Sequence, residues 1–134
     1  MKGANAEAAK TPLGSDSPRY HWLLFDADGT LFDYDRAERA ALGQALAQIG
    51  VEFQPGHLAA YRRINQALWH RVEKGELTPG VVKVRRFELL LEAIQVAQSP
   101  TALSASYLEH LANCSELVED AAAVLAALHQ KHRI

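Results

Sequence analysis

One short segment, residues 20–25, has the sequence of a β-strand, and it constrains the fold more than any other feature. Its last four residues, Trp22, Leu23, Leu24 and Phe25, are apolar without alternation, as in a strand buried on both faces. A lone buried strand cannot satisfy its own backbone donors and acceptors, and even a two-stranded sheet is marginal alone. The segment therefore predicts an α/β sheet that needs further strands.

Apolar spacing and end signals predict helices for the rest of the chain. Thr78 and Ser99, each followed by a proline, mark two helix starts, and Asp35 is the expected cap of the first helix. The expected helices run from Asp35 to Gly50, over about 55–74, from Thr78 through Ile94, from Ser99 through Cys114, and over about 120–132.

No segment up to Arg133 has the pattern of a second strand. Ile134 follows the last expected helix, where the next strand of a βαβ unit would begin. We therefore expect the sequence to stop inside an α/β core, with only its first strand and one later core helix present.

Composition excludes several classes of protein. The net charge of −2 and the pI of about 6.3 argue against a sequence-independent nucleic-acid binder. No apolar run approaches the length of a membrane span, and one cysteine cannot form an internal disulfide. We expect a cytoplasmic protein whose residues 1–18 form a mobile tail, and nothing in the sequence indicates its oligomeric state.

Two aspartates, Asp26 and Asp28, follow the expected strand directly, and Gly29 comes next. Ligands of open α/β sheets bind at the carboxyl ends of strands. Clustered carboxylates repel each other unless a cation relieves them, and Mg²⁺ prefers such oxygen ligands. An aspartate can also attack phosphorus, while a second carboxyl moves the leaving-group proton. The alternative is that both residues only form a turn.

The longer string favours the catalytic interpretation. DADGTLFD at residues 26–33, after an apolar strand near the N-terminus, resembles the first motif of the haloacid dehalogenase-like (HAD) hydrolases. YRRINQALW at 61–69, GELT at 75–78 and RRF at 85–87 are similar to the cap of the pyrimidine 5′-nucleotidase branch. The resemblance covers about residues 20–134.

This resemblance implies a HAD-like α/β core with an inserted all-helical cap, in a chain dominated by helices. The first core strand and the catalytic loop would occupy residues 19–34, and the cap residues 35–114. Residues 115–134 would begin the remaining core.

By the same resemblance, Asp26 is the nucleophile and Asp28 the general acid/base. The Asp26 carboxylate and the Asp28 backbone carbonyl would bind Mg²⁺. The family also needs a later Ser or Thr, a Lys and a distal acidic pair, none of which can be assigned here. The chain alone is therefore expected to be inactive.

Three cap residues, Asn65, Trp69 and Arg86, are candidates for substrate contact. Trp69 could stack on a base, and Arg86 could meet a phosphate or base oxygen. The alternatives are core packing for Trp69 and a structural salt bridge for Arg86. The basic pair of Arg85 and Arg86 is expected on a solvated face.

The implied function is that of a Mg²⁺-dependent phosphomonoester hydrolase that works through an aspartyl-phosphate, with a nucleoside 5′-monophosphate as its substrate. Two alternatives stay open. One is a phosphatase for another small ester of the phosphoglycolate type, and the other is a non-catalytic truncated module that binds a partner or oligomerises.

Overall fold

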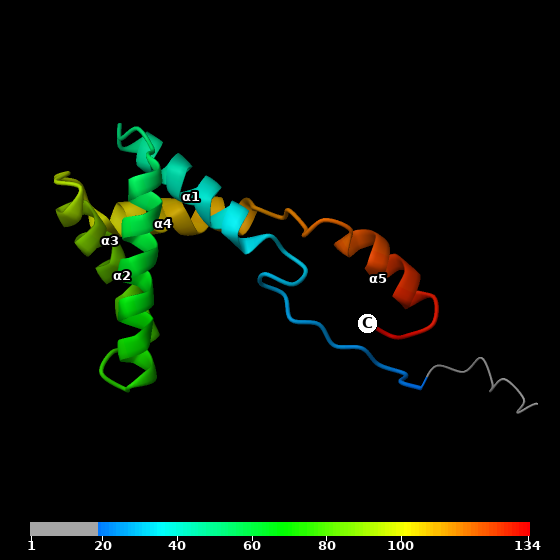
Figure 1. The fold of residues 1–134 in the computed structure, drawn as a ribbon. Helices are drawn as coiled ribbons and strands as arrows, with labels where there is room; N and C mark the ends of the chain where they lie inside the picture. The colour runs from blue at the N-terminus through cyan, green and yellow to red at the C-terminus, as the bar shows by residue number, and fades with distance from the viewer. Residues whose placement is uncertain (1–18) are drawn as a thin grey trace, which may run out of the picture.

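The computed structural model describes residues 19–134, so the predicted tail at residues 1–18 lies outside the described part. Within that part the regular elements are all helices, which confirms the predicted helix-dominated architecture (Figure 1). They are α1 (Tyr34–Gln48), α2 (Pro55–Glu73), α3 (Pro79–Ala93), α4 (Pro100–Asn113) and α5 (Ala121–His129).

Prolines and capping side chains set the helix starts. Helices α2, α3 and α4 each begin on a proline, and the Ser99 hydroxyl accepts a hydrogen bond from Ala102 N–H at 3.2 Å. The predicted cap at Asp35 is wrong. The Asp33 carboxylate accepts from Arg36 N–H at 3.1 Å and caps α1, whereas the Asp35 carboxylate lies in the first turn and pairs with Arg62.

Helices α1–α4 form a compact bundle, called the cap below (residues 34–113). Helix α1 packs against α4, α2 against α3, and α3 against α4. All four helices contribute to one apolar core. Its buried members are Ala41, Leu42, Ala45, Leu46, Tyr61, Phe87, Leu90, Leu91, Leu103 and Tyr107.

Three aromatic rings form the centre of this core. The ring centroids of Tyr61, Phe87 and Tyr107 lie 5.2 to 5.6 Å apart, and all three side chains are fully buried. Such packing joins α2, α3 and α4 through one cluster, so it links most of the cap.

Phe87→Ala is therefore expected to lower the free energy of unfolding by about 3–5 kcal/mol, because the neighbouring rings cannot collapse into the space. Urea titration of the 134-residue chain, followed by circular dichroism, measures this change. Leu108→Ala is the control, because Leu108 lies exposed on α4 and its truncation leaves no buried cavity. A loss for Phe87→Ala no larger than that of the control would contradict the packing described here.

The strand predicted at residues 20–25 does not form. The segment makes one parallel bridge, in which Leu23 N–H donates to Arg133 O and Arg133 N–H to His21 O, each at 2.9 Å. Leu24 is 93% exposed and Trp22 61% exposed. The physical reason is that a strand needs a neighbouring strand to pair its backbone groups, and residues 19–134 offer it only one bridging residue.

Helix α5 and this extended segment lie beside each other and apart from the cap (Figure 1). The last helix is shorter than predicted, since it ends at His129, and the chain then turns back to pair Arg133 with Trp22. Across residues 19–134, no helix combines the length and the apolar character that crossing a bilayer requires.

Two chain segments connect the cap to the rest, and they run side by side. Phe32 and Leu117 form an antiparallel bridge, and Asp33 N–H donates to Glu116 O at 3.0 Å. Val118 N–H donates to Leu31 O at 2.8 Å. The chain therefore enters and leaves the cap at one place, next to the DADGTLFD loop.

Candidate active site

The DADGTLFD loop folds as a tight turn stabilised by its own backbone. Ala27 O accepts hydrogen bonds from Leu31 N–H and Phe32 N–H, each at 2.9 Å, and Gly29 N–H donates to Phe32 O at 2.9 Å. Gly29 has φ of 74°, in the left-handed region that favours glycine. The turn returns the chain to Asp33, which caps α1.

Asp26 and Asp28 stand at the carboxyl end of the extended segment, where the sequence placed them. Both are exposed, and Thr30 Oγ1 donates a hydrogen bond to Asp26 Oδ2 at 3.4 Å. Asp28 lines two cavities, of about 280 and 240 Å³, beside the junction with the cap. A substrate bound at either cavity would meet this carboxylate.

The residues present fit part of a magnesium site. Asp26 and Asp28 offer hard oxygen donors, and Mg²⁺ completes an octahedron with water and substrate oxygens when few protein ligands are available. No group of three or more His, Cys, Asp or Glu residues that could hold a metal occurs among residues 19–134. The two aspartates therefore provide a minimal, solvent-exposed donor set.

Asn65 and Arg86 come together inside the cap. Arg86 Nη1 donates to Asn65 Oδ1 at 3.3 Å, and Arg86 is only 7% exposed. Its guanidinium lies 5.1 to 5.7 Å from the ring centroids of Tyr61, Phe87 and Tyr107. The solvated face predicted for the basic pair is correct for Arg85, which pairs with Glu88, and wrong for Arg86.

The reason is geometric. Adjacent residues of a helix point about 100° apart, so one member of a pair can face the core while the other faces solvent. The alternative of a structural salt bridge for Arg86 is also wrong within residues 19–134, where it forms a hydrogen bond and cation–π contacts instead.

Trp69 lies elsewhere on the cap surface. It is 41% exposed, so the alternative of buried core packing is wrong. It lines a cavity of about 510 Å³ on α2 together with Arg63, Gln66 and His70. The residues that line the two Asp28 cavities include none of the three cap candidates.

Tyr34, the first residue of α1, is a site residue that the sequence interpretation missed. It lines both cavities together with Asp28. Burial raises the pKa of Tyr34, and the nearby Glu38 carboxylate raises it further, while the Tyr107 hydroxyl and Arg86 oppose these effects. The phenol therefore stays protonated at neutral pH. In the sequence, the only sign that Tyr34 lies at this site is its position directly after DADGTLFD.

Known proteins that are similar to this chain are HAD-hydrolases and pyrimidine 5′-nucleotidases. No protein-family model matches the chain. The chain is 31% identical over 113 residues to the HAD-hydrolase YfnB of Bacillus subtilis, covering 84% of this chain and 48% of YfnB. It is 30% identical to the pyrimidine 5′-nucleotidase PynA of Streptococcus pneumoniae, covering 84% of this chain and 47% of PynA.

A third relative is the pyrimidine 5′-nucleotidase YjjG of Escherichia coli, which is 26% identical over 87% of this chain and 50% of its own length. The crystal structure of magnesium-bound YfnB superposes with a TM-score of 0.80 at 30% identity, over 86% of this chain and 50% of that one. That structure is described as revealing interdomain movement in YfnB.

The chain thus spans about half the length of the relatives it matches. Over the matched part, the chain follows the fold of a HAD-hydrolase. By sequence and by fold, this chain is therefore a relative of the haloacid dehalogenase-like hydrolases, and its relatives include two pyrimidine 5′-nucleotidases.

Proposed function

We propose that this chain carries the nucleophile and the acid/base of a Mg²⁺-dependent phosphatase for nucleoside 5′-monophosphates. The observation that carries the proposal is the pair Asp26 and Asp28, exposed in one tight loop beside two cavities at the cap junction. The similarity to two pyrimidine 5′-nucleotidases supports the nucleotide as substrate.

In the proposed mechanism, an oxygen of Asp26 attacks phosphorus opposite the leaving group. The new Asp26–phosphate bond forms as the bond from phosphorus to the ribose oxygen breaks. Asp28 gives its proton to the departing ribose oxygen, and then takes a proton from the water that hydrolyses the phospho-aspartate. Mg²⁺, held by the Asp26 carboxylate and the Asp28 carbonyl, would offset charge on the phosphoryl group.

Two further assignments belong to this proposal. Asn65, Trp69 and Arg86 remain candidates for recognition of the substrate, with Arg86 acting through Asn65 because it is itself buried. The single cysteine, Cys114, favours a reducing compartment, and we propose the cytoplasm.

The direct test uses the full-length product of the gene that encodes this chain. We expect release of inorganic phosphate from uridine 5′-monophosphate with Mg²⁺ and none with excess chelator. Release from phosphoglycolate but not from the nucleotide would support the small-ester alternative. No release from either substrate would support a non-catalytic module and overturn the proposal.

Asp28→Asn is expected to slow hydrolysis of uridine 5′-monophosphate much more than that of p-nitrophenyl phosphate. The ribose alkoxide needs a proton as it leaves, whereas p-nitrophenolate is stable without one, so loss of a general acid affects them unequally. Steady-state kcat for both substrates measures the difference. An equal loss for the two esters would show that Asp28 acts in metal binding or in the loop structure.

A further inference from the structure

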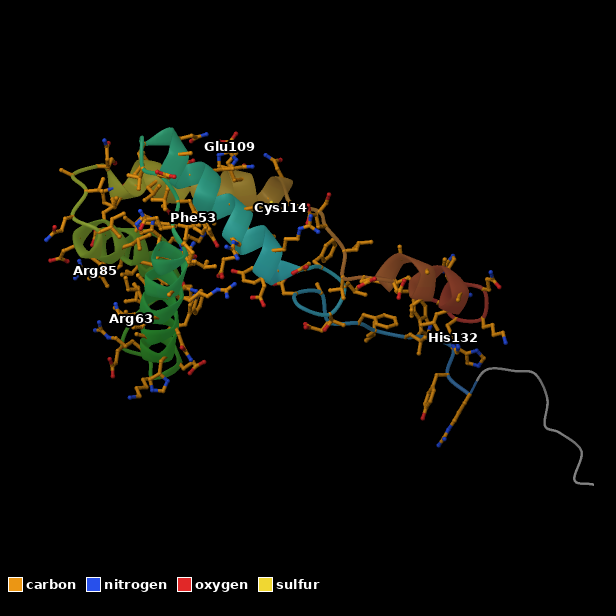
Figure 2. All side chains as sticks on the ribbon, turned by 45° about the horizontal axis from the view of Figure 1, so that its top comes forward. Phe53, Arg63, Arg85, Glu109, Cys114 and His132 are labelled. Atoms are coloured by element: carbon orange, nitrogen blue, oxygen red, sulfur yellow. The ribbon has the colours of Figure 1, made fainter. Side chains whose placement is uncertain are left out.

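The larger Asp28 cavity extends from the catalytic loop under the edge of the cap. Its volume is about 280 Å³, and it is built from three parts of the chain. Asp28 and Phe32 come from the loop and Tyr34 from the start of α1, and the end of α4 with the residues just after it contributes Leu111, Cys114 and Glu116. Figure 2 shows Cys114 at this junction between the cap and the rest of the chain.

The polar lining groups are the carboxylates of Asp28 and Glu116 and the phenol of Tyr34, and the rest of the lining is apolar. Phe32, Ala37, Leu111 and Cys114 contribute carbon and sulfur, and Phe32 is 40% exposed although it lies beside the site. No Lys or Arg lines this cavity among the described residues. A ligand carboxylate there would be repelled by Asp28 and Glu116, whereas a planar ring can pack on the two aromatic side chains.

Tyr34 is half-buried and is the first residue of α1, so its backbone belongs to a folded helix that packs against α4. A ring carried by an already ordered helix costs less to order on binding than one on a free loop.

We propose that this cavity binds the base of the nucleotide, between Phe32 and Tyr34, with Asp28 on the side of the leaving group. The assignment rests on the proposed nucleotidase function and moves the base-stacking role from Trp69 to Phe32 and Tyr34. The assignment also distinguishes a nucleotide from a phosphoglycolate-type ester, because only the nucleotide has a planar ring that can fill the cavity.

Cys114 provides a test that needs no turnover. It is the only cysteine of the chain and is half-buried in the cavity wall, so its reaction with a small thiol reagent reports on occupancy. The rate is measured on the 134-residue chain with increasing uridine, uridine 5′-monophosphate or ribose 5-phosphate. We expect the first two to slow the reaction and ribose 5-phosphate to leave it unchanged.

One variant tests where the base binds. Phe32→Ala is expected to weaken protection by uridine roughly tenfold or more, the scale of one base–aromatic stacking contact. Each variant is compared with its own ligand-free rate, because Phe32→Ala also changes access to the thiol. Leu108→Ala is the matched control, since Leu108 is an exposed apolar residue of α4 that lines none of the cavities described above.

Three outcomes would overturn the proposal. They are an unchanged rate with all ligands up to their solubility limits, equal protection by ribose 5-phosphate, and protection lost in Trp69→Ala but retained in Phe32→Ala. The phosphate-release assay is independent of these results. Hydrolysis without protection would reject the base site alone, and protection without hydrolysis would reject the nucleotidase function alone.

Discussion

Asp26→Asn should lower kcat for phosphate release by several orders of magnitude while the protein keeps its fold. The amide cannot attack phosphorus as a carboxylate does, so the covalent route is lost. Asp26 is exposed, and its one side-chain hydrogen bond among the described residues is the 3.4 Å contact from Thr30. The nearly isosteric change therefore removes chemistry with little effect on packing.

The measurement is phosphate release by the full-length gene product, with circular dichroism as the check on folding. Asp120→Asn is the matched control. Asp120 is exposed, lines none of the cavities described above, and has a left-handed φ of 64° that Asn adopts as readily as Asp. Turnover near that of the unmodified protein in Asp26→Asn, with contaminating phosphatase excluded, would remove Asp26 from its assigned role.

Residues 1–134 produced alone are expected to show no phosphatase turnover. Neither Asp26 nor Asp28 forms an ion pair among residues 19–134, and no cluster of three metal-ligating side chains occurs there. Two carboxylates alone hold Mg²⁺ weakly, because the ion sheds its water reluctantly. The phosphoryl group would also lack a preorganised positive partner in the transition state.

Assay of the purified 134-residue chain with nucleoside monophosphates and Mg²⁺ tests this expectation. Exposed Trp22 and Leu24 also predict aggregation on concentration, which light scattering detects. If the short chain turns over substrate and Asp26→Asn abolishes that turnover, the chemistry needs fewer groups than we infer.

The helical part of the fold was predictable because its signals are local. A capping residue followed by proline placed the starts of α3 and α4 correctly, and apolar spacing identified the faces that Leu42, Leu46 and Phe87 bury. The error at Asp35 was also local. Two aspartates stand within two residues of each other, and only the backbone path of the loop decides which one caps α1.

The features that sequence could not supply depend on distant partners. An apolar run such as residues 22–25 has a strand pattern, but strand formation requires neighbours that periodicity does not reveal. The burial of Arg86 depends on rings contributed by α2 and α4, far away in the chain. The Asp28 cavities likewise need Leu111 or Val118 to return beside the loop, so the role of Tyr34 could not be inferred from its position alone.

The side-by-side connections at Asp33 and Glu116 have a consequence for how such a chain changes over generations. Because the backbones of these two connections are hydrogen-bonded to each other, the cap is a long chain segment whose two ends lie in contact. When a segment with joined ends is lengthened or shortened, the entropy cost of closing it changes only with the logarithm of its length. Insertions and deletions within the cap are therefore expected to leave the geometry of the DADGTLFD turn nearly unchanged, so the cavities beside it can diversify while Asp26 and Asp28 stay in place.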